Sequence, residues 1–416
     1  MVPNGWRQES LGNLFEFKNG LNTDKDQYGS GYKFVNVMDV FKNDILTESK
    51  IIGRVQVTDS QLEGYQIKYG DVLFNRTSET FDEIAMAAVY LDDAIATFGG
   101  FVIRGRPTGN DILSHYSPYL FQSKNYRSQA IKLGQGAVRA NIGQKDLSKV
   151  LVLLPPLPEQ KKIAKILSTW DKAITTTEQL LANSQQQKKA LMQQLLTGKK
   201  RLLDKNGGRF SGEWKKGKLS DIANIDSGYA FKSNDFTDSD KGIPIIRMSD
   251  FKAGGIDISS AAKVIPESTI GLDRFKLKTG DFVFGMSGSL SNYGWVKEQD
   301  LPCFLNQRVG RILAKECAVQ LFVTYLYLSD KIQQSILDKA AGAAQLNISS
   351  TDLRTTIVHY PCYEEQQKIA AVLSTADQEI SALQQKLEAL KQEKKALMQQ
   401  LLTGKRRVKI DDKEVA

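Results

Sequence analysis

PPLPEQKKIAKILSTWDKAI at residues 155–174 and PCYEEQQKIAAVLSTADQEI at residues 361–380 are two copies of one pattern, at an offset of 206 residues without a gap. Further along, KKALMQQLLTGK fills residues 188–199 and returns unchanged at residues 394–405. Self-similarity at a fixed offset indicates a duplicated architecture. The order along the chain is therefore a module, a connecting segment, a second module and a second connecting segment.

The connecting segments have the periodicity of a coiled-coil helix, because residues of one stripe return in alternating steps of four and three. The first stripe consists of Ile163, Leu167, Trp170, Ile174, Thr177, Leu181, Ser184, Lys188, Leu191 and Leu195. The second consists of Ile369, Leu373, Ala376, Ile380, Leu383, Leu387, Leu390, Lys394, Leu397 and Leu401. Each segment starts near a proline and ends at Thr-Gly, where a left-handed helix cap is expected.

The heptad stripe has two interpretations, a core helix packed on its own domain or one member of a helix pair. The duplication favours the pair, because two equivalent units in one chain can associate about a pseudo-twofold axis, as the subunits of a homodimer do. The helices are then antiparallel, with a module at each end. We predict modules at residues 1–155 and 208–360 and long spacer helices at residues 156–200 and 361–405.

The modules repeat more loosely than the helices. Trp6 matches Trp214, and the pairs Gly70-Asp71 and Asn141-Ile142 match Gly280-Asp281 and Asn347-Ile348, at offsets that drift by a few residues. Small insertions in surface loops produce such drift, since loops tolerate changes of length.

Each module is predicted to have a mixed α/β (α+β) fold with many short strands. The clearest strand candidates are KFVNVMD (33–39), GDVLFNR (70–76) and FVIRGR (101–106). One helix is expected from Pro118 to Leu133, with a counterpart from Val319 to Lys339.

Composition indicates a soluble globular protein of two domains, with 416 residues, 41% hydrophobic and 25% charged. The net charge of +9 is uneven: residues 1–155 carry 17 basic and 17 acidic side chains, residues 211–360 carry 18 and 17, and residues 156–210 carry 11 and 4. Near-neutral modules exclude a nonspecific polycation.

The lack of a signal peptide, of a membrane-spanning run and of a CxxC spacing predicts where the protein is located and that its cysteines are reduced. The start, MVPNGWRQES, lacks the regions of a signal peptide, and no apolar run is long enough to span a membrane, so we expect a cytoplasmic protein. Cys303, Cys317 and Cys362 are odd in number and lack a CxxC spacing. Reduced, buried thiols are therefore expected.

Two stretches resemble motifs of nucleotide-binding or methyltransferase sites, but each lacks a residue that the motif requires. The stretch GEWKKGKL at residues 212–219 resembles a phosphate-binding loop, but Leu219 stands where a magnesium-binding hydroxyl is required. The Pro-Pro pair at residues 155–156 lacks the acidic or amide neighbour of an amino-methyltransferase loop. It is interpreted as a linker that leads into a helix.

Metal and nucleophile chemistry is not predicted either. The two histidines, His115 and His359, are too few for a zinc site or a histidine-based triad. The acidic pairs Asp82-Glu83 and Asp92-Asp93 are interpreted as solvated loop charges instead of a magnesium site. We therefore expect no catalysis and no metal in this chain.

These features together resemble the specificity (S) subunit of type I restriction-modification enzymes, over essentially the whole chain. The most specific marks are the proline-preceded Glu-Gln-x-x-Ile-Ala start of each helix and its Leu-Leu-Thr-Gly end. Gly5-Trp6, Leu11-Gly12 and residues 136–147 and 342–353 are weaker marks. The resemblance implies two target recognition domains that each read one half of an asymmetric bipartite DNA site, while the helix pair holds them at a fixed separation.

The resemblance also implies partners. In that family two methyltransferase (M) subunits bind one S subunit and methylate adenine with S-adenosylmethionine, and two motor-nuclease (R) subunits add cleavage that needs ATP and magnesium. This chain is then a non-catalytic, cofactor-free subunit for antiviral defence that binds double-stranded DNA, without membrane contact. Two alternatives stay open: the S subunit of a modification-only system, and a coiled-coil protein adaptor without DNA binding.

Polar and basic loop residues are the candidate DNA contacts, because arginine can bind guanine, and asparagine adenine, through two hydrogen bonds. In the first module they are Asn75, Arg76, Thr77, Ser78, Arg104 and Arg139. In the second they are Arg247, Ser287, Ser289, Asn292, Tyr293, Arg308 and Arg311. The alternative for each is an exposed or internally paired side chain.

A basic cluster ends each long helix, Lys199-Lys200-Arg201 in the first copy and Lys405-Arg406-Arg407 in the second. Cations at this position favour the helix dipole. Contact with DNA phosphates or with an M subunit is the alternative.

Overall fold

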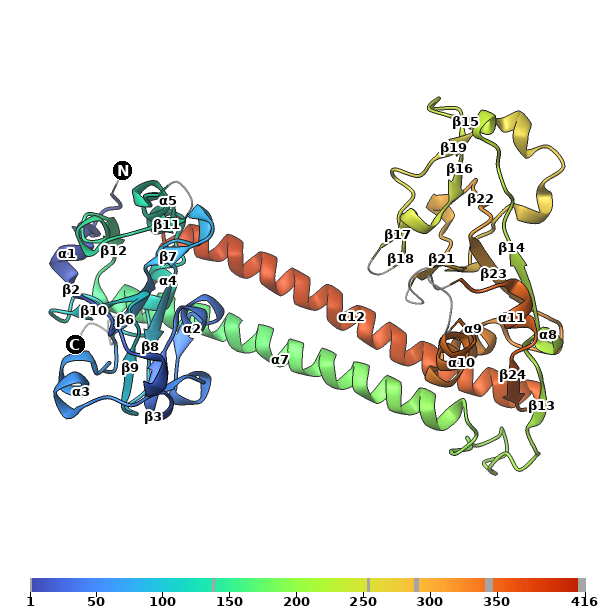
Figure 1. The fold of residues 1–416 in the computed structure, drawn as a ribbon, viewed down its shortest axis with the longest axis horizontal. Helices are drawn as coiled ribbons and strands as arrows, with labels where there is room; N and C mark the ends of the chain where they lie inside the picture. Colours follow the sequence, from blue (N-terminus) through green and yellow to red (C-terminus); the bar gives the residue numbers. More distant parts are fainter. Residues whose placement is uncertain (1, 137–138, 253–254, 288–291, 341–346, 411–416) are drawn as a thin grey trace. The chain divides into compact units, whose positions relative to one another are not determined.

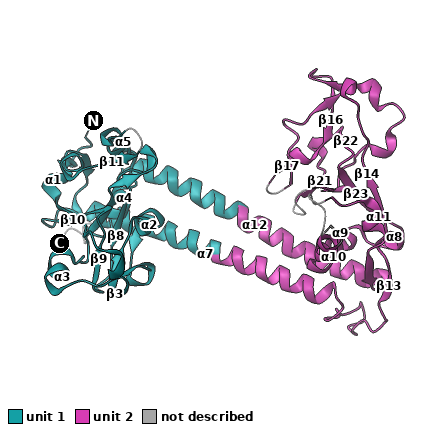
Figure 2. Cartoon of the chain, viewed as in Figure 1, with its two compact units in different colours: residues 1–178, 385–416 teal, residues 179–384 magenta. Residues whose placement is uncertain are grey.

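The computed structural model describes residues 2–136, 139–252, 255–287, 292–340 and 347–410. The chain forms two compact units: unit 1 consists of residues 1–178 and 385–416, and unit 2 consists of residues 179–384 (Figure 2). The long helices α7 (Leu157–Leu195) and α12 (Tyr363–Leu401) each contribute to both units. A unit is therefore a module with the start of one long helix and the end of the other.

The first module is built around a five-stranded sheet in the order β2-β10-β6-β8-β4 (Figure 1). A three-stranded sheet, β5-β3-β9, and the pairs β1-β12 and β11-β7 complete its described strands. The bounds are β1 Arg7–Ser10, β2 Phe15–Asn19, β3 Tyr28–Val35, β4 Ile45–Leu46, β5 Arg54–Val55, β6 Val72–Asn75, β7 Thr77–Ser78, β8 Ala87–Tyr90, β9 Ala96–Phe98, β10 Val102–Pro107, β11 Ala140–Asn141 and β12 Leu151–Leu154.

Short helices connect these strands. They are α1 Leu11–Leu14, α2 Val37–Lys42, α3 Asp59–Tyr65, α4 Ser117–Leu120, α5 Lys124–Leu133 and α6 Gln144–Leu147, with 3-10 turns η1 Lys25–Gln27, η2 Glu48–Lys50 and η3 Phe81–Glu83.

Two local predictions for this module were wrong. The strand expected over residues 33–39 ends at Val35, because Asn36 starts helix α2 with a capping box. The single helix expected over residues 118–133 is two helices, because the hydroxyl of Ser123 accepts a hydrogen bond from the Tyr126 amide and caps α5. The strands expected at residues 70–76 and 101–106 are present as β6 and β10.

The second module contains two four-stranded sheets, β14-β23-β20-β21 and β15-β19-β16-β22, and the pairs β13-β24 and β17-β18. The bounds are β13 Lys215–Lys218, β14 Ala223–Ser227, β15 Phe236–Thr237, β16 Ile243–Ile246, β17 Phe251–Lys252, β18 Gly255–Ile256, β19 Lys263–Val264, β20 Phe282–Gly285, β21 Tyr293–Trp295, β22 Phe304–Leu305, β23 Val309–Ala314 and β24 Ile357–Tyr360.

Its helices are α8 Leu219–Ile222, α9 Gln320–Leu328, α10 Asp330–Ala340 and α11 Ser350–Arg354, and its 3-10 turns are η4 Ser233–Asp235, η5 Met248–Asp250, η6 Pro266–Thr269, η7 Asp273–Phe275 and η8 Glu298–Asp300. The helix expected over residues 319–339 is again two helices, because the chain is extended at Ser329 between α9 and α10.

The two modules share their central strand order. β10 lies between β2 and β6 in the first module, and β23 lies between β14 and β20 in the second, with antiparallel pairing throughout. β3 pairs in parallel with β9, as β16 does with β22. The loose sequence repeat therefore corresponds to a shared fold.

The long helices close the core of each unit. The start of α7 contributes Ile163 and Leu167 to the first core, and the end of α12 contributes Leu401. The second core contains Leu195 from the end of α7 and Ile369 from the start of α12. Burying a leucine or isoleucine side chain contributes about 1.5–3 kcal/mol, so each module is stabilised by both helices.

Within each unit the helix segments run antiparallel. In unit 1, Asp171 binds Lys394 and Glu178 binds Lys391, so partner numbers fall in α12 as they rise in α7. The predicted stripe positions are all buried or half-buried. The helices end at Leu195 and Leu401, and the left-handed glycine expected after each is present three residues further on, Gly198 with φ +72° and Gly404 with φ +67°.

The three cysteines are free thiols. Cys303 is buried, as expected, but Cys317 and Cys362 are exposed, so the prediction of burial was wrong for these two. Cys317 lies in the segment between β23 and α9, and Cys362 in the segment between β24 and α12, which a count of cysteines cannot reveal.

Candidate functional site

Each unit contains the same triad of polar side chains at the junction of the module with the two helices. In unit 1 the Tyr119 hydroxyl donates to Asp171 Oδ2 at 2.7 Å, and Lys394 Nζ donates to Asp171 Oδ1 at 2.5 Å. Unit 2 repeats both distances with Tyr325, Asp377 and Lys188. We call these the junction triads.

The junction triads tie three elements together. Tyr119 lies on α4 of the module, Asp171 on α7 and Lys394 on α12. Burial and the hydrogen bond to Asp171 raise the pKa of Tyr119, so its hydroxyl stays protonated and remains the donor. A polar group in a heptad seam disfavours shifted pairings, because a slip would leave it without its partner. The triads therefore fix the register of the helix pair.

An ion pair joins the start of each long helix to the end of the other. In unit 2, Arg201 donates to both carboxylate oxygens of Glu365 at 2.7 Å and to the carbonyl of Gly212 at 2.9 Å. In unit 1, Arg407 binds Glu159 and donates to the carbonyl of Asn4. We call these the helix-end ion pairs.

A tryptophan accompanies each helix-end ion pair. The Arg407 guanidinium lies 5.8 Å from the Trp6 ring centre, and Arg201 lies 6.0 Å from that of Trp214. Neither expectation for the basic clusters, the helix dipole or an external contact, describes these two arginines. They are internal partners of buried carboxylates, because the antiparallel pairing brings the opposite helix start beside them.

A cleft with a volume of about 600 Å³ lies in the first module. It is lined by Val37, Met38, Phe41, Thr77, Ser78, Glu79, Glu83, Met86, Phe101 and Arg139. We call it the reading cleft. It brings Arg139 together with Thr77 and Ser78, which lie far from it in the sequence.

Local bonds hold the polar wall of the reading cleft. The Thr77 hydroxyl donates to Asn141 Oδ1 at 2.8 Å, where β7 pairs with β11. The Ser78 hydroxyl donates to Glu83 Oε2 at 2.9 Å. Arg76, just before β7, is half-buried, and its carbonyl accepts from the Ile142 amide at 3.0 Å. This wall is therefore preorganised.

Two predicted contacts of the first module lie inside it. Asn75 is fully buried at the end of β6. Arg104 is 4% exposed and donates to the carbonyl of Gln66 at 3.2 Å, and burial lowers its pKa. A buried side chain cannot reach a base edge from this position, so we leave both out of the proposed DNA surface, together with Ser78, which is 5% exposed.

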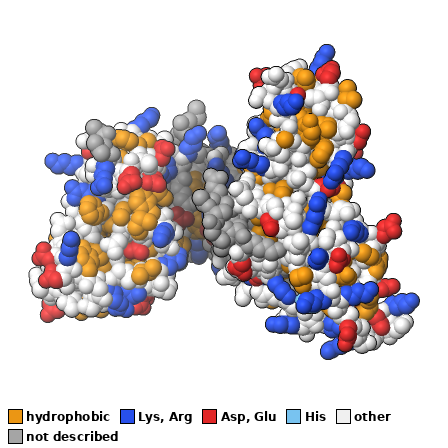
Figure 3. All heavy atoms as spheres, turned by 45° about the vertical axis from the view of Figure 1, so that its right-hand side comes forward, with side chains coloured by type: hydrophobic (Ala, Val, Ile, Leu, Met, Phe, Trp, Pro, Cys, Tyr) orange, Lys and Arg blue, Asp and Glu red, His pale blue; other side chains and the backbone are white. Residues whose placement is uncertain are grey.

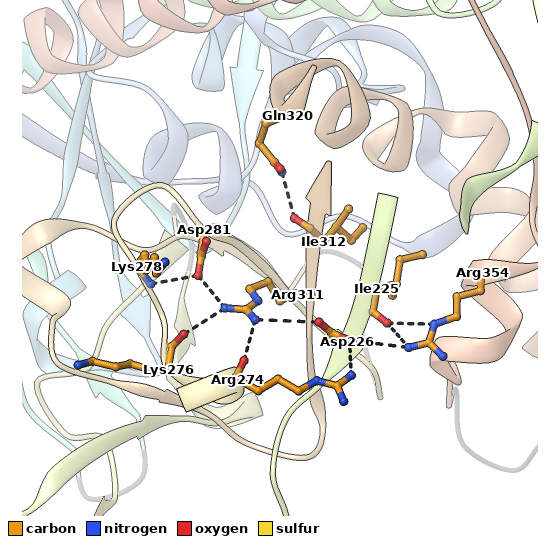
Figure 4. A network of polar contacts seen from close by, with 10 residues as sticks. All are labelled: Ile225, Asp226, Arg274, Lys276, Lys278, Asp281, Arg311, Ile312, Gln320 and Arg354. Carbon is orange, nitrogen blue, oxygen red and sulfur yellow. Dashed lines mark hydrogen bonds and ion pairs between the residues drawn. The ribbon is translucent and has the colours of Figure 1, made fainter. Parts of the chain in front are cut away.

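Arg311 of the second module occupies the equivalent position and is also internal (Figure 4). It is 7% exposed, donates to Asp281 Oδ2 at 3.1 Å, and donates to the carbonyls of Arg274 and Lys276. Asp281 in turn accepts from the Lys278 amide. The Gly-Asp motif therefore anchors a buried arginine, and Arg311 is likewise left out.

The remaining predictions for the second module have mixed surroundings. Ser287 forms a backbone bridge with Asn347, the counterpart of Thr77 with Asn141. Tyr293 is half-buried against Phe282 and Trp295, and burial raises its pKa.

Three further predicted contacts differ in their exposure. Asn292 is half-buried, and its carbonyl accepts from the Gly285 amide. Arg247 is half-buried at the start of η5, whereas Arg308 is exposed in the turn before β23. Ser289 lies outside the described residues.

Sequence reasoning missed the apolar part of the reading cleft. Phe101 and Met38 are 66% and 53% exposed. On the face drawn in Figure 3, hydrophobic side chains gather on unit 1. An exposed aromatic residue on a rigid turn is a signal of binding. The Gly-Gly-Phe sequence at residues 99–101 could have indicated such a turn.

The described part of the chain contains no cluster of three metal-ligating side chains. Among the same residues, no helix combines the length and apolar character needed to cross a membrane.

Comparison with known proteins places these geometries in a family. The family model of the type I restriction modification DNA specificity domain matches residues 3–183 and 211–392. The specificity subunit of type I restriction enzyme MjaVIII from Methanocaldococcus jannaschii is 30% identical over 302 residues, covering 70% of each chain. The putative MjaX specificity subunit of that organism is 25% identical and covers 98% of this chain and 95% of the relative.

Solved structures show the same fold. The S subunit of a type I restriction-modification system from M. genitalium superposes with a TM-score of 0.57 at 16% identity, covering 97% of this chain and 98% of that chain. A chain of another type I restriction-modification system gives a TM-score of 0.56 at 19% identity, covering 97% of both. With two matched domains and the shared fold, this chain belongs to the family of type I restriction-modification specificity subunits.

Proposed function

We propose that each module reads one half of an asymmetric bipartite site in double-stranded DNA, and that the helix pair sets the distance between the half-sites. One observation carries the proposal: the junction triads and helix-end ion pairs are the same in both units, while the loops that line the reading cleft differ in sequence from their counterparts in the second module. A shared frame with two different surfaces is what reading two different sequences requires.

The helix pair also docks two copies of the methyltransferase partner in this proposal. Two grooves of about 650 and 680 Å³, one in each unit, share a lining. The shared residues are Lys188, Lys189, Met192, Gln193, Leu196, Thr197 and Lys199 in unit 2, and Lys394, Lys395, Met398, Gln399, Leu402, Thr403 and Lys405 in unit 1. The repeat includes exposed lysine and glutamine side chains that neither the cores nor the junction triads require, so two copies of one partner with acidic and apolar groups fit the grooves.

The chemistry of the complex then belongs to the partners. S-adenosylmethionine is held by the M subunits, and ATP and magnesium by R subunits that join through the complex, while this chain is non-catalytic. A modification-only system is the alternative within the family. A coiled-coil adaptor without DNA binding is the alternative from another class, and the near-neutral modules are the observation in its favour.

Adenine-methylation mapping in cells tests the proposal. Cells that express this chain with its methyltransferase partner are expected to carry an interrupted two-part methylation motif, which is absent when this chain is omitted. A stable complex with an active methyltransferase but without a chain-dependent motif would support the adaptor instead.

A matched insertion tests the spacing role. Seven residues inserted after Glu178 and seven after Gln384 keep the heptad phase and add about 10 Å to each helix. The spacer between the half-sites is expected to grow by about 3 base pairs, because base pairs rise 3.4 Å along DNA, while both half-site sequences stay the same. Insertion in one helix only is the control and should abolish methylation. An unchanged spacer with both insertions would contradict the proposal that the helix pair sets the distance between the half-sites.

A further inference from the structure

The turn before β10 presents one side chain at the rim of the reading cleft. The Val102 amide donates to the Gly99 carbonyl at 2.8 Å and closes the turn. The Phe101 carbonyl accepts from the Arg76 amide at 2.9 Å, at the end of strand β6. With its backbone bonded, the Phe101 side chain points outward and is 66% exposed.

The second module builds the same turn from different residues. The Val309 amide donates to the Asn306 carbonyl at 2.9 Å, and the Arg308 carbonyl accepts from the Met286 amide at 3.0 Å. Met286 follows strand β20 as Arg76 follows β6. Phe101 and Arg308 are therefore equivalent positions, although their surroundings share almost no sequence.

Neighbouring bonds support the equivalence. Gly20 donates to the Val102 carbonyl at 3.0 Å, and Gly228 donates to that of Val309 at 3.1 Å. Each turn is thus held from both sides by backbone bonds, which do not depend on the side chain that it presents. The backbone bonds keep the position of the turn the same in both modules, whereas the side chain at that position can differ.

The chemistry at this position differs sharply between the modules. Phe101 lines the reading cleft together with Met38, Phe41 and Met86, so the surface around it is largely apolar. Arg308 is exposed, and its positively charged guanidinium group presents several N–H donors in one plane. In the major groove, an apolar side chain contacts the methyl group of thymine, whereas arginine donates two hydrogen bonds to guanine.

We propose that Phe101 and Arg308 are equivalent specificity residues, with Phe101 selecting a thymine in the half-site of the first module and Arg308 a guanine in that of the second. The assignment rests on the proposed function and deepens it. DNA is the occupant because the polar wall of the same cleft carries Thr77 and the exposed, basic Arg139, which complement base edges and phosphates.

Exchange of the two residues tests the assignment in the full chain with its methyltransferase partner. Phe101→Arg is expected to replace an A·T pair by a G·C pair at one position of one half-site, and Arg308→Phe to do the reverse in the other half-site. Discrimination for the original base should fall on the order of tenfold, the size of a good base contact. The spacer and the other half-site should stay the same.

Controls separate this idea from the proposed function. Ile52→Arg, at an 87% exposed position outside the lining of the reading cleft, and Arg209→Phe, in the linker before the second module, should leave the motif unchanged. If the parent chain directs no motif, the proposed function fails. If the parent does and both exchanges leave every base preference as it was, the specificity assignment is overturned.

If an exchange variant does not methylate DNA at all, alanine substitutions test the assignment instead. Phe101→Ala and Arg308→Ala remove the contact without adding a new group, and the exposed positions leave the core intact. Each should relax the preference at one base of one half-site only. A motif that stays fully specified in both alanine variants would also overturn the assignment.

Discussion

A chain ending at residue 206 is expected to pair with a second copy of itself and to direct methylation to a palindromic site. Unit 1 needs the end of α12, where Lys394 completes the junction triad and Arg407 the helix-end ion pair. The end of α7 supplies the same sequence, with Lys188 and Arg201 at the matching positions. Two truncated chains can therefore complete each other, and both then present the first module.

Mass by light scattering and methylation mapping measure this outcome. The mass should be twice that of the truncated chain, and the motif should contain the first half-site and its inverted repeat. A chain ending at residue 186 is the matched control, because it keeps the module but lacks the repeat at residues 188–199. It should stay monomeric. A monomeric 1–206 chain would contradict the interchangeability of the two helix ends.

Arg201→Met is expected to destabilise unit 2 by about 3–5 kcal/mol, the cost of leaving a buried charge without its partner. The Glu365 side chain is 1% exposed, and Arg201 donates to both of its oxygens. Urea unfolding followed by tryptophan fluorescence measures the loss, because Trp214 lies beside Arg201. Addition of Glu365→Leu should restore most of the stability, since it removes the stranded carboxylate.

The chain offers a matched control on the same helix pair. Lys391 binds Glu178 at 2.7 Å, but both side chains are about half exposed, at 48% and 47%. An exposed ion pair contributes about 0–1 kcal/mol, so Lys391→Met should change the free energy of unfolding by no more than that. Equal losses in Arg201→Met and Lys391→Met would contradict the structural role of the helix-end ion pair.

The helix pair could be predicted almost completely from the sequence. The step of four and three along α7 and α12 is a local property of the chain, and the offset of 206 residues made the two segments equivalent. The strands β6 and β10 were also predictable, because each is a short run with apolar residues bounded by turn residues. By contrast, Ser123 caps the start of α5 and Asn36 caps the start of α2. These local hydrogen bonds interrupt the helix predicted over residues 118–133 and the strand predicted over residues 33–39.

The candidate site was predictable only in part. Thr77 and Arg139 meet in the reading cleft, but the sequence could not distinguish them from Ser78, Arg104 and Arg311, which are buried. All of these side chains can donate hydrogen bonds, so their chemistry alone does not separate them. Exposure separates them, and exposure depends on which strand lies alongside.

The sequence by itself determined the duplication, the heptad seam and the family, because repeats and periodicity are written in the order of residues. Only the tertiary structure decided that each unit combines the start of one helix with the end of the other, that Arg201 and Arg407 bind buried carboxylates, and that Phe101 and Arg308 are equivalent. The physical reason is that burial and pairing are set by partners distant in the chain, and folding alone brings them into contact.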